Sequence, residues 1–177
     1  MSEHNRYHIS YKDFHSLVQP RLDYVCNLWF PCIGKVKQQK LQVCQNKCMR
    51  FIMSEHNRYH ISYKDFQSLN YLDVNSRVQY LTLCQMYKIL NKKGPKYLQC
   101  ILTHSTHQHN TRNRELGLTI PRMNSFGKKS FSYIGPVLWN KLSEATRKAE
   151  NVARFKKTVK NELLMNMKNY EQCDFIY

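Results

Sequence analysis

The clearest pattern in the chain is a helical repeat of apolar residues between positions 35 and 52. Apolar side chains recur there at three- and four-residue intervals, which places them along one side of an α-helix. Basic residues occupy many of the other positions, where they either contact phosphate or are simply solvated. We therefore expect an amphipathic helix whose apolar stripe consists of Leu41, Cys44, Cys48 and Phe51.

Two further segments have a helical pattern. The first begins at Asn75 or Ser76, either of which can cap a helix with its side-chain oxygen, and continues to about Asn91. It is apolar on most sides, so we expect it to be the central helix. Residues 151–167 are predicted to form an amphipathic helix with an apolar stripe of Val152, Phe155, Val159 and Leu163.

In the rest of the N-terminal two thirds of the chain, proline and polar residues interrupt the helical pattern. Residues 14–30 are rich in aliphatic and aromatic side chains, and Pro20 lies among them. Because proline lacks a backbone N–H and clashes with the preceding turn, we expect a helical piece on each side of it. Residues 103–113 are polar and contain three histidines, so we expect a long loop there.

The region after that loop mixes weak alternation with glycine and proline. Alternation of apolar and polar residues is typical of strands, and it favours short extended segments at residues 116–123 and 126–133. Gly135 and Pro136 are expected to open a short helix through Leu142, since proline is tolerated in the first helical turn.

Together these elements predict a mainly α fold, namely a small irregular helical domain with a long polar loop and one or two short extended segments. We expect residues 14–168 to form it and residues 169–177 to be a frayed tail. Residues 1–17 recur as residues 53–69 with 16 of 17 positions identical. Two near-identical copies in different contexts indicate a recent duplication or an assembly join rather than a repeat architecture. The extra segment, residues 1–13, is expected to be poorly ordered.

Charge distinguishes this chain from an average domain. Its 177 residues include 28 Lys and Arg against 12 Asp and Glu, a formal net charge of +16. Residues 88–168 hold 17 of the basic and 4 of the acidic residues, so the excess lies mainly in the C-terminal part. Such a field attracts polyanions. We expect the RNA or DNA backbone as partner, and neither a membrane nor a small-molecule substrate. The sequence leaves the oligomeric state open.

The sequence points to an intracellular protein without catalytic chemistry. It has no run of 18 apolar residues, residues 1–8 lack the apolar core of a signal peptide, and its seven cysteines are an odd number. We therefore expect reduced thiols and a place in the nucleus or cytoplasm. Paired aspartates, a phosphate-binding glycine loop and a Gly-x-Ser-x-Gly element are all missing from the sequence. We expect no catalytic residue and no cofactor.

Cysteine and histidine spacing raises an alternative of a different class. Two thiolates and two imidazoles can hold zinc in a tetrahedral site. Such a set occurs at Cys44, Cys48, His56 and His60, and would make a zinc-stabilised interaction module. Against it, the seven-residue gap between the pairs is short for a zinc finger. Both cysteines also lie on the expected apolar stripe, where cysteine behaves as a small hydrophobe.

Basic residues interleaved with hydroxyl and aromatic side chains form the main binding pattern. Cationic side chains contact phosphates, and aromatic rings stack on bases. We predict nucleic-acid binding by Arg112, Arg114, Lys128, Lys129, Arg154, Lys156, Lys157 and Lys160. Phe131, Tyr133 and Trp139 lie in the same region, and we interpret these three as holding the segment to the helices.

The same region carries an ordered set of motifs. It reads His-Asn-Thr-Arg at 109–112, Ile-Pro-Arg at 120–122, Gly-Lys-Lys-Ser-Phe-Ser-Tyr-x-Gly at 127–135 and Leu-Trp-Asn-x-Leu at 138–142, before Phe155 and Lys156 in a basic helix. With shorter pieces upstream in matching order, the chain resembles the C-terminal region of reverse transcriptases from LINE-type (non-LTR) retrotransposons. Asp73 and Ser143 depart from that family, which has proline at both positions.

The resemblance implies a noncatalytic C-terminal fragment of an RNA-directed DNA polymerase. The family's polymerase chemistry resides in an upstream palm with a Tyr/Phe-Ala-Asp-Asp motif, and this motif and the endonuclease domain are both missing here. What the resemblance implies for this region is help in holding template RNA and target DNA. A decayed reading frame without function is the third hypothesis.

Overall fold

The computed structural model describes residues 14–56, 58–103 and 116–167. This part of the chain consists of α-helices, short 3-10 or π-helical turns and connecting segments, without a sheet, so the predicted mainly α fold is confirmed. The expectations for residues 1–13 and 169–177, and for most of the polar loop, concern residues outside the described part.

Short helical pieces build the N-terminal segment. They are η1 (Phe14–Val18), α2 (Gln19–Asp23), α3 (Cys26–Trp29) and η2 (Phe30–Cys32). Pro20 lies in the first turn of α2, where its missing N–H leaves no hydrogen bond unmade. The expected division at this proline is therefore confirmed. Between α2 and α3, Val25 has a φ of 48°, which is rare for a β-branched residue.

Helix α4 (Lys35–Met53) confirms the predicted helix but only half of its predicted stripe, because Leu41 and Cys48 are half-buried against the core while the most buried residues are others. Gln45, only 1% exposed, and Met49 face the protein interior, whereas Cys44 and Phe51 are exposed. The reason is a hydrogen bond that the sequence pattern does not reveal. The Gln45 side-chain amide donates to the backbone carbonyl of Leu72 over 2.9 Å, and a buried amide with such a partner is tolerated in a protein interior.

Gln42 extends this contact to the start of the central helix. Its side-chain amide donates to Oε1 of Gln45 over 3.0 Å, and its own Oε1 accepts the backbone N–H of Val74 at 2.9 Å. Val74 begins a helix, so its N–H has no acceptor within that helix. The two glutamines therefore join α4 to the segment that leads into α6. In the sequence, α5 (Tyr63–Ser68) lies between α4 and α6, and it begins with a capping box of Ser62 and Asp65.

The central helix, α6 (Val74–Leu90), begins one residue earlier than the first predicted cap. Asp73 is the N-cap, and its carboxylate accepts the backbone N–H of Ser76 at 3.0 Å. The prediction of Asn75 or Ser76 as cap is therefore wrong, because both residues lie inside the first turn. Burial raises the pKa of the Asp73 carboxyl above its usual range.

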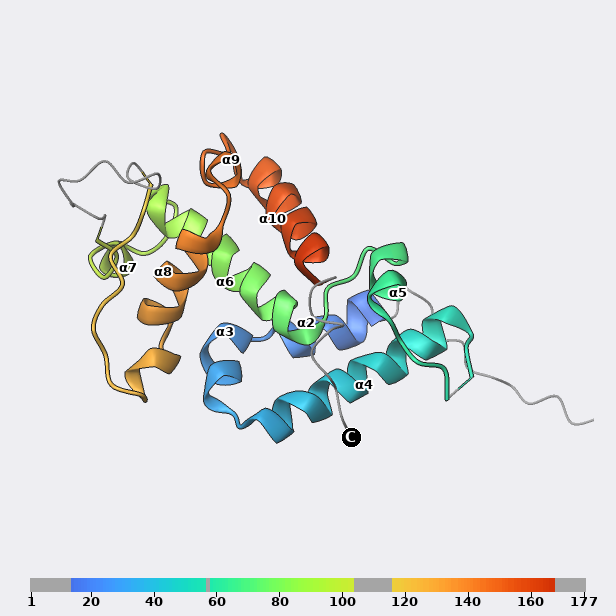
Figure 1. The fold of residues 1–177 in the computed structure, drawn as a ribbon. Coiled ribbons are helices and arrows are strands. Elements are labelled where there is room, and N and C mark those ends of the chain that lie inside the picture. Colours follow the sequence, from blue (N-terminus) through green and yellow to red (C-terminus); the bar gives the residue numbers. More distant parts are fainter. Residues whose placement is uncertain (1–13, 57, 104–115, 168–177) are drawn as a thin grey trace, which may run out of the picture.

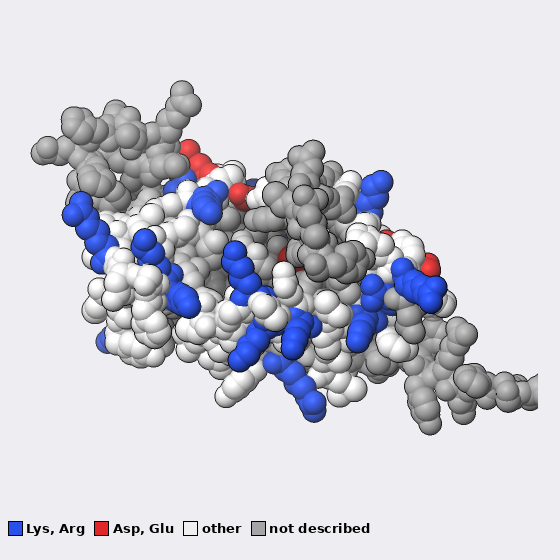
Figure 2. Space-filling view, turned by 60° about the horizontal axis from the view of Figure 1, so that its bottom comes forward, with Lys and Arg blue, Asp and Glu red and all other residues white. Residues whose placement is uncertain are grey.

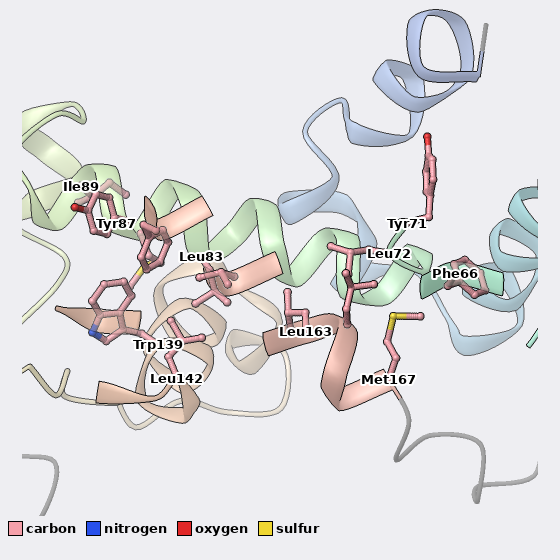
Figure 3. Packing of buried hydrophobic residues seen from close by; sticks show 14 of the residues in the cluster. Phe66, Tyr71, Leu72, Leu83, Tyr87, Ile89, Trp139, Leu142, Leu163 and Met167 are labelled. Atoms are coloured by element: carbon pink, nitrogen blue, oxygen red, sulfur yellow. The ribbon is translucent and has the colours of Figure 1, made fainter. Parts of the chain in front are cut away.

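The central position of α6 is confirmed. Figure 1 shows it running between α4 and α10 (Val152–Asn166), with α8 along its other end. Tyr87 of α6 stacks on Phe155 of α10 with ring centroids 4.3 Å apart, and its hydroxyl donates to the carbonyl of Ala149 over 2.7 Å. Phe155, Val159 and Leu163 of the predicted stripe are buried, and Val152 is half-buried. Figure 3 shows Leu163 beside α6. Asn151 caps α10 by accepting from the backbone N–H of Arg154.

Helix α8 (Phe131–Lys141) corrects two expectations. It begins four residues before Gly135, so residues 126–133 are not extended but contain the 3-10 turn η3 (Gly127–Lys129) and the first turn of α8. A Cβ at Gly135 would lie 2.5 Å from Sδ of Met86. The absence of a side chain there lets α8 approach α6 closely, and this packing outweighs the low helix propensity of glycine and proline.

Trp139 and Asn140, both from the family-like motif, hold the segment before α8 in place. The Trp139 indole N–H donates to the carbonyl of Leu116 over 2.8 Å, and its ring stacks on Phe155 at 5.8 Å. Asn140 makes two bonds to Leu118, donating to its carbonyl over 2.8 Å and accepting its N–H at 2.9 Å. The Asn140 amide thus bonds both backbone groups of Leu118, as the backbone of a neighbouring strand would. Leu118 is the only residue of the described ranges in a β-bridge.

Two short helices complete the described chain. They are α7 (Lys96–Gln99), after α6, and α9 (Glu144–Arg147), between α8 and α10. Ser143 caps α9 and also contacts Glu162 of α10, donating from its backbone N–H to Oε1 over 3.1 Å. The backbone N–H of Ser143 is a donor that a proline at this position would lack.

Candidate nucleic-acid interface

The structure places the predicted binding residues in separate regions. Arg112 and Arg114 lie outside the described residues. Lys128 and Lys129 are exposed on η3, directly before α8. The remaining four are on α10, where Arg154, Lys156 and Lys157 are exposed and Lys160 is half-buried.

The η3 lysines and the α10 residues do not form one site. Helix α8 meets α10 through Trp139, near its C-terminal end, whereas Lys129 precedes its N-terminal end. With 11 residues, α8 is about 16 Å long. The two groups of cations therefore lie toward opposite ends of α8.

Within α10, the helical spacing separates the pair Lys156 and Lys160 from the pair Arg154 and Lys157. Lys156 and Lys160 are four residues apart and lie beside the buried stripe of Phe155 and Val159, at the edge that adjoins α6. Arg154 points away from the core and pairs with Glu150 at 3.6 Å. Only the first pair is therefore placed to act together with side chains of another helix.

Two cations of α6 join this pair. Arg77 lies close enough to Lys160 that its charge, together with the larger effect of burial, lowers the pKa of the Lys160 ammonium. Burial raises the pKa of the Cys84 thiol, while Tyr80, Lys156, Arg77 and Lys88 act in the opposite direction. Lys156, Arg77 and Lys88 therefore all lie near Cys84, and Arg77 also lies near Lys160. We call this set the basic cluster: Arg77, Lys88, Lys156 and Lys160.

Arg77 is held rigidly within the basic cluster. Its guanidinium makes two bonds to Asp23 of α2, from Nε at 3.0 Å and from Nη2 at 2.6 Å. Asp23 is itself positioned by the side-chain amide of Gln19 at 2.8 Å. The guanidinium also lies 5.3 Å from the ring centroid of Tyr80, a cation–π contact. A bidentate pair with such support fixes the direction of the charge.

The other three members have no acidic partner within the described part of the chain. Among these residues, no carboxylate forms an ion pair with Lys88, Lys156 or Lys160. Burial, and next the nearby Cys84, raise the pKa of Tyr80 to about 12, and the Tyr80 hydroxyl is hydrogen-bonded to Cys84. The basic cluster therefore offers these three ammonium groups to an anion.

Sequence reasoning missed Arg77 and Lys88. The two residues are eleven positions apart, which is about three helical turns and places both on one side of α6. That spacing is visible in the sequence, but their proximity to Lys156 and Lys160 depends on how α6 and α10 pack. No local pattern contains that information.

A second basic surface belongs to α4. Its 19 residues include five cations and no acidic residue. Figure 2, which brings the lower side of Figure 1 forward, shows Lys and Arg side chains spread over this side of the molecule with few acidic ones. The cations of α4 are Lys35, Lys37, Lys40, Lys47 and Arg50. Exposed aliphatic side chains lie between these cations, unlike in the basic cluster.

The residues of the zinc alternative are not gathered into a site. In the described ranges, no group of three or more His, Cys, Asp or Glu side chains lies close enough to hold a metal ion. Cys44 and Cys48 are neighbours on α4, and burial followed by the proximity of Cys44 raises the pKa of the Cys48 thiol. His56 and His60 follow the end of the helix and are exposed. The histidines expected in the polar loop lie outside the described residues.

Comparisons with known proteins leave the family open. The chain gives no match to protein-family models, to curated proteins or to solved structures. The resemblance to LINE-type reverse transcriptases therefore rests on the sequence motifs alone. Separately, no helix in the described ranges is both long and apolar enough to cross a membrane.

Proposed function

We propose that this chain is a noncatalytic nucleic-acid-binding domain, related in origin to the C-terminal region of LINE-type reverse transcriptases. In this proposal the basic cluster holds the phosphate backbone of RNA or DNA. The cations of η3 and the outer face of α10 contribute to the surrounding positive field rather than to the contact itself.

The observation that carries the proposal is the proximity of Arg77 and Lys160, where no carboxylate of the described residues neutralises Lys160. Burial first, and the charge of Arg77 second, lower the pKa of the Lys160 ammonium, so its charged form is disfavoured in the free protein. A phosphate beside Lys160 offsets that cost and gains charge-assisted hydrogen bonds. Arg77 is already paired with Asp23, so the gain falls mainly on the lysines.

The family-like motifs support the proposed origin in a different way. Trp139 and Asn140 are engaged with Leu116 and Leu118, so these motif residues maintain the fold and do not form a contact surface. We infer that the motif marks ancestry, whereas binding belongs to the basic cluster. The zinc-stabilised module has no gathered ligand set in the described ranges, and no observation favours it.

A binding assay with matched lysine variants tests the proposal. The cluster variant is K88A/K156A/K160A, and the control is K64A/K96A/K141A, which removes the same charge from three exposed positions elsewhere. Fluorescence anisotropy with a labelled RNA duplex of about 20 base pairs and a matching RNA–DNA hybrid gives the affinities, since that length exceeds the span of a typical duplex-binding domain. Thermal unfolding followed by circular dichroism establishes that each variant is folded.

We expect the cluster variant to lose at least about tenfold in affinity, because a charge-assisted contact contributes about 1.5 kcal/mol or more. The control should lose much less. An equal loss in both variants would show that the general positive field, and not the basic cluster, binds nucleic acid. Undetectable binding of the wild-type protein at low salt would overturn the function itself.

A further inference from the structure

The outer face of α4 exposes aliphatic and aromatic side chains that the fold does not use. Val36 is 66% exposed, Val43 is 52% exposed and Phe51 is 54% exposed. A shallow groove of about 410 Å³ runs over this face, lined by Val36, Gln39, Lys40, Val43, Cys44 and Lys47. The opposite side of α4 is anchored by the buried Gln45 and Met49. The helix is therefore held in place while one face stays uncovered by the described residues.

The spacing of the exposed residues is that of a helix that packs on another helix. Val36, Lys40, Val43 and Lys47 follow each other at intervals of four, three and four residues. Positions spaced in this way form one seam along a helix, and a partner helix inserts its own side chains between them. The seam extends over about 17 Å, at 1.5 Å per residue.

The charge of the seam determines which partner fits. Lysines alternate with valines along it, and α4 carries no acidic residue. A second copy of this chain would place lysines opposite lysines, and the repulsion opposes such pairing. A nucleic-acid backbone satisfies the lysines but offers nothing apolar to cover the valines. An acidic amphipathic helix satisfies both.

We propose that the outer face of α4 is a docking site for an amphipathic helix of a protein partner. The apolar side of that helix covers Val36 and Val43, and its flanking Asp or Glu residues pair with Lys40 and Lys47. This interaction is separate from nucleic-acid binding at the basic cluster, whose residues belong to α6 and α10. Figure 1 shows α4 and α10 on opposite sides of α6.

The probe for this site is a synthetic peptide of three heptads with Leu at positions a and d and Glu at e and g. Its glutamates repel one another at neutral pH, so the peptide does not pair strongly with itself. Cys44 lies in the groove and is exposed, and Cys100 after α7 is exposed as well. Alkylation followed by mass spectrometry therefore reports on both thiols in one sample. We expect the peptide to slow alkylation of Cys44 but not of Cys100.

Two variants identify the contacts. V36E/V43E puts charge on the apolar positions and should weaken peptide binding at least about tenfold, since burying an unpaired charge is costly. The control Y97E/M165E adds the same charge at exposed positions, 69% and 62% exposed, elsewhere on the protein and should lose far less affinity. K40E/K47E reverses the charge of the seam. It should release the glutamate peptide and bind a version with Lys at e and g, which the wild-type protein should not bind.

Failure of this proposal is distinguishable from failure of the nucleic-acid proposal. An unprotected Cys44, or equal peptide affinity in V36E/V43E and its control, overturns the docking site. Protection of Cys44 by the RNA duplex, with duplex affinity lost in K40E/K47E, assigns the face to nucleic acid and also overturns it. The variant K88A/K156A/K160A should leave peptide affinity within about twofold, since a distant site is energetically independent.

Discussion

Gln45 on α4 and Leu72 before α6 are joined by one buried hydrogen bond of 2.9 Å, across 27 residues of sequence. The glutamine side chain is almost completely buried and donates to a backbone carbonyl that precedes the start of α6. Together with the buried Met49, this contact lies on the side of α4 that faces the interior, whereas Cys44 and Phe51 are on the outside.

Replacing Gln45 by Leu should lower the free energy of unfolding by about 1–3 kcal/mol, because the Leu72 carbonyl and Gln42 amide lose a buried partner. Gln39→Leu on the exposed side of the same helix is the matched control and should change it by less than about 0.5 kcal/mol. Urea unfolding monitored by circular dichroism measures both. A loss of similar size in the two variants would show that the bond to Leu72 is not important for stability.

The raised pKa of Asp73 predicts that the free energy of unfolding falls as the pH rises above the acidic range. Because burial raises the pKa of its carboxyl in the folded state, the charged form is the disfavoured one there. The stability contributed by this group is fully present below the ordinary pKa of aspartate and is lost as the pH rises through the raised value. An asparagine at this position cannot titrate and caps a helix equally well.

We therefore expect D73N to be more stable than the wild-type protein near neutral pH, with the difference shrinking as the pH falls through the acidic range. Asp73→Ala removes the cap and should cost about 1 kcal/mol. Thermal unfolding at several pH values separates the two effects. A D73N variant that is less stable than wild type at neutral pH would contradict the sign of the shift.

Gly135 and Met86 should be energetically coupled. A methyl group at Gly135 would lie 2.5 Å from Sδ of Met86, whose side chain is fully buried and has little room to move. Gly135→Ala is expected to cost about 1–3 kcal/mol by overpacking, despite the better helix propensity of alanine. In a Met86→Ala background the same change should cost less or become favourable. Additive costs in this double-mutant cycle would refute the close approach.

Salt dependence tests the basic cluster one lysine at a time. If Lys156 and Lys160 each neutralise a phosphate, each change to alanine should reduce the slope of log affinity against log salt concentration by about 0.7–0.9. Arg154, which already pairs with Glu150, should affect the slope less. Affinities measured at salt concentrations from about 50 to about 200 mM provide the slopes, because binding changes by orders of magnitude over that range.

The sequence predicted the long helices well, because α4, α6 and α10 carry periodic patterns over many residues, although the N-cap of α6 was assigned wrongly. The prediction failed where contacts between residues far apart in the sequence determine which residues are buried and where a helix begins. Gln45 is buried because Leu72 provides an acceptor, and α8 forms through Gly135 and Pro136 because Met86 closes against a bare backbone. Neither partner is visible from local spacing.

The candidate site shows the same division. Lys156 and Lys160 were found as part of a basic helix, since charge runs are local. Arg77 and Lys88 were not, because only the packing of α6 against α10 brings them to the same place. Asp23 was missed as well, and its bond to Arg77 joins residues 54 apart in the sequence.

The bond between Tyr87 and Ala149 also constrains the order of events during synthesis. It spans 62 residues, and the stacking partner of Tyr87, Phe155, follows later still. At about 5–20 residues per second, a ribosome takes roughly 3–12 seconds to supply that stretch. Throughout this interval the side of α6 that α10 covers in the folded protein lacks that cover. Apolar surface left uncovered in this way promotes aggregation of nascent chains.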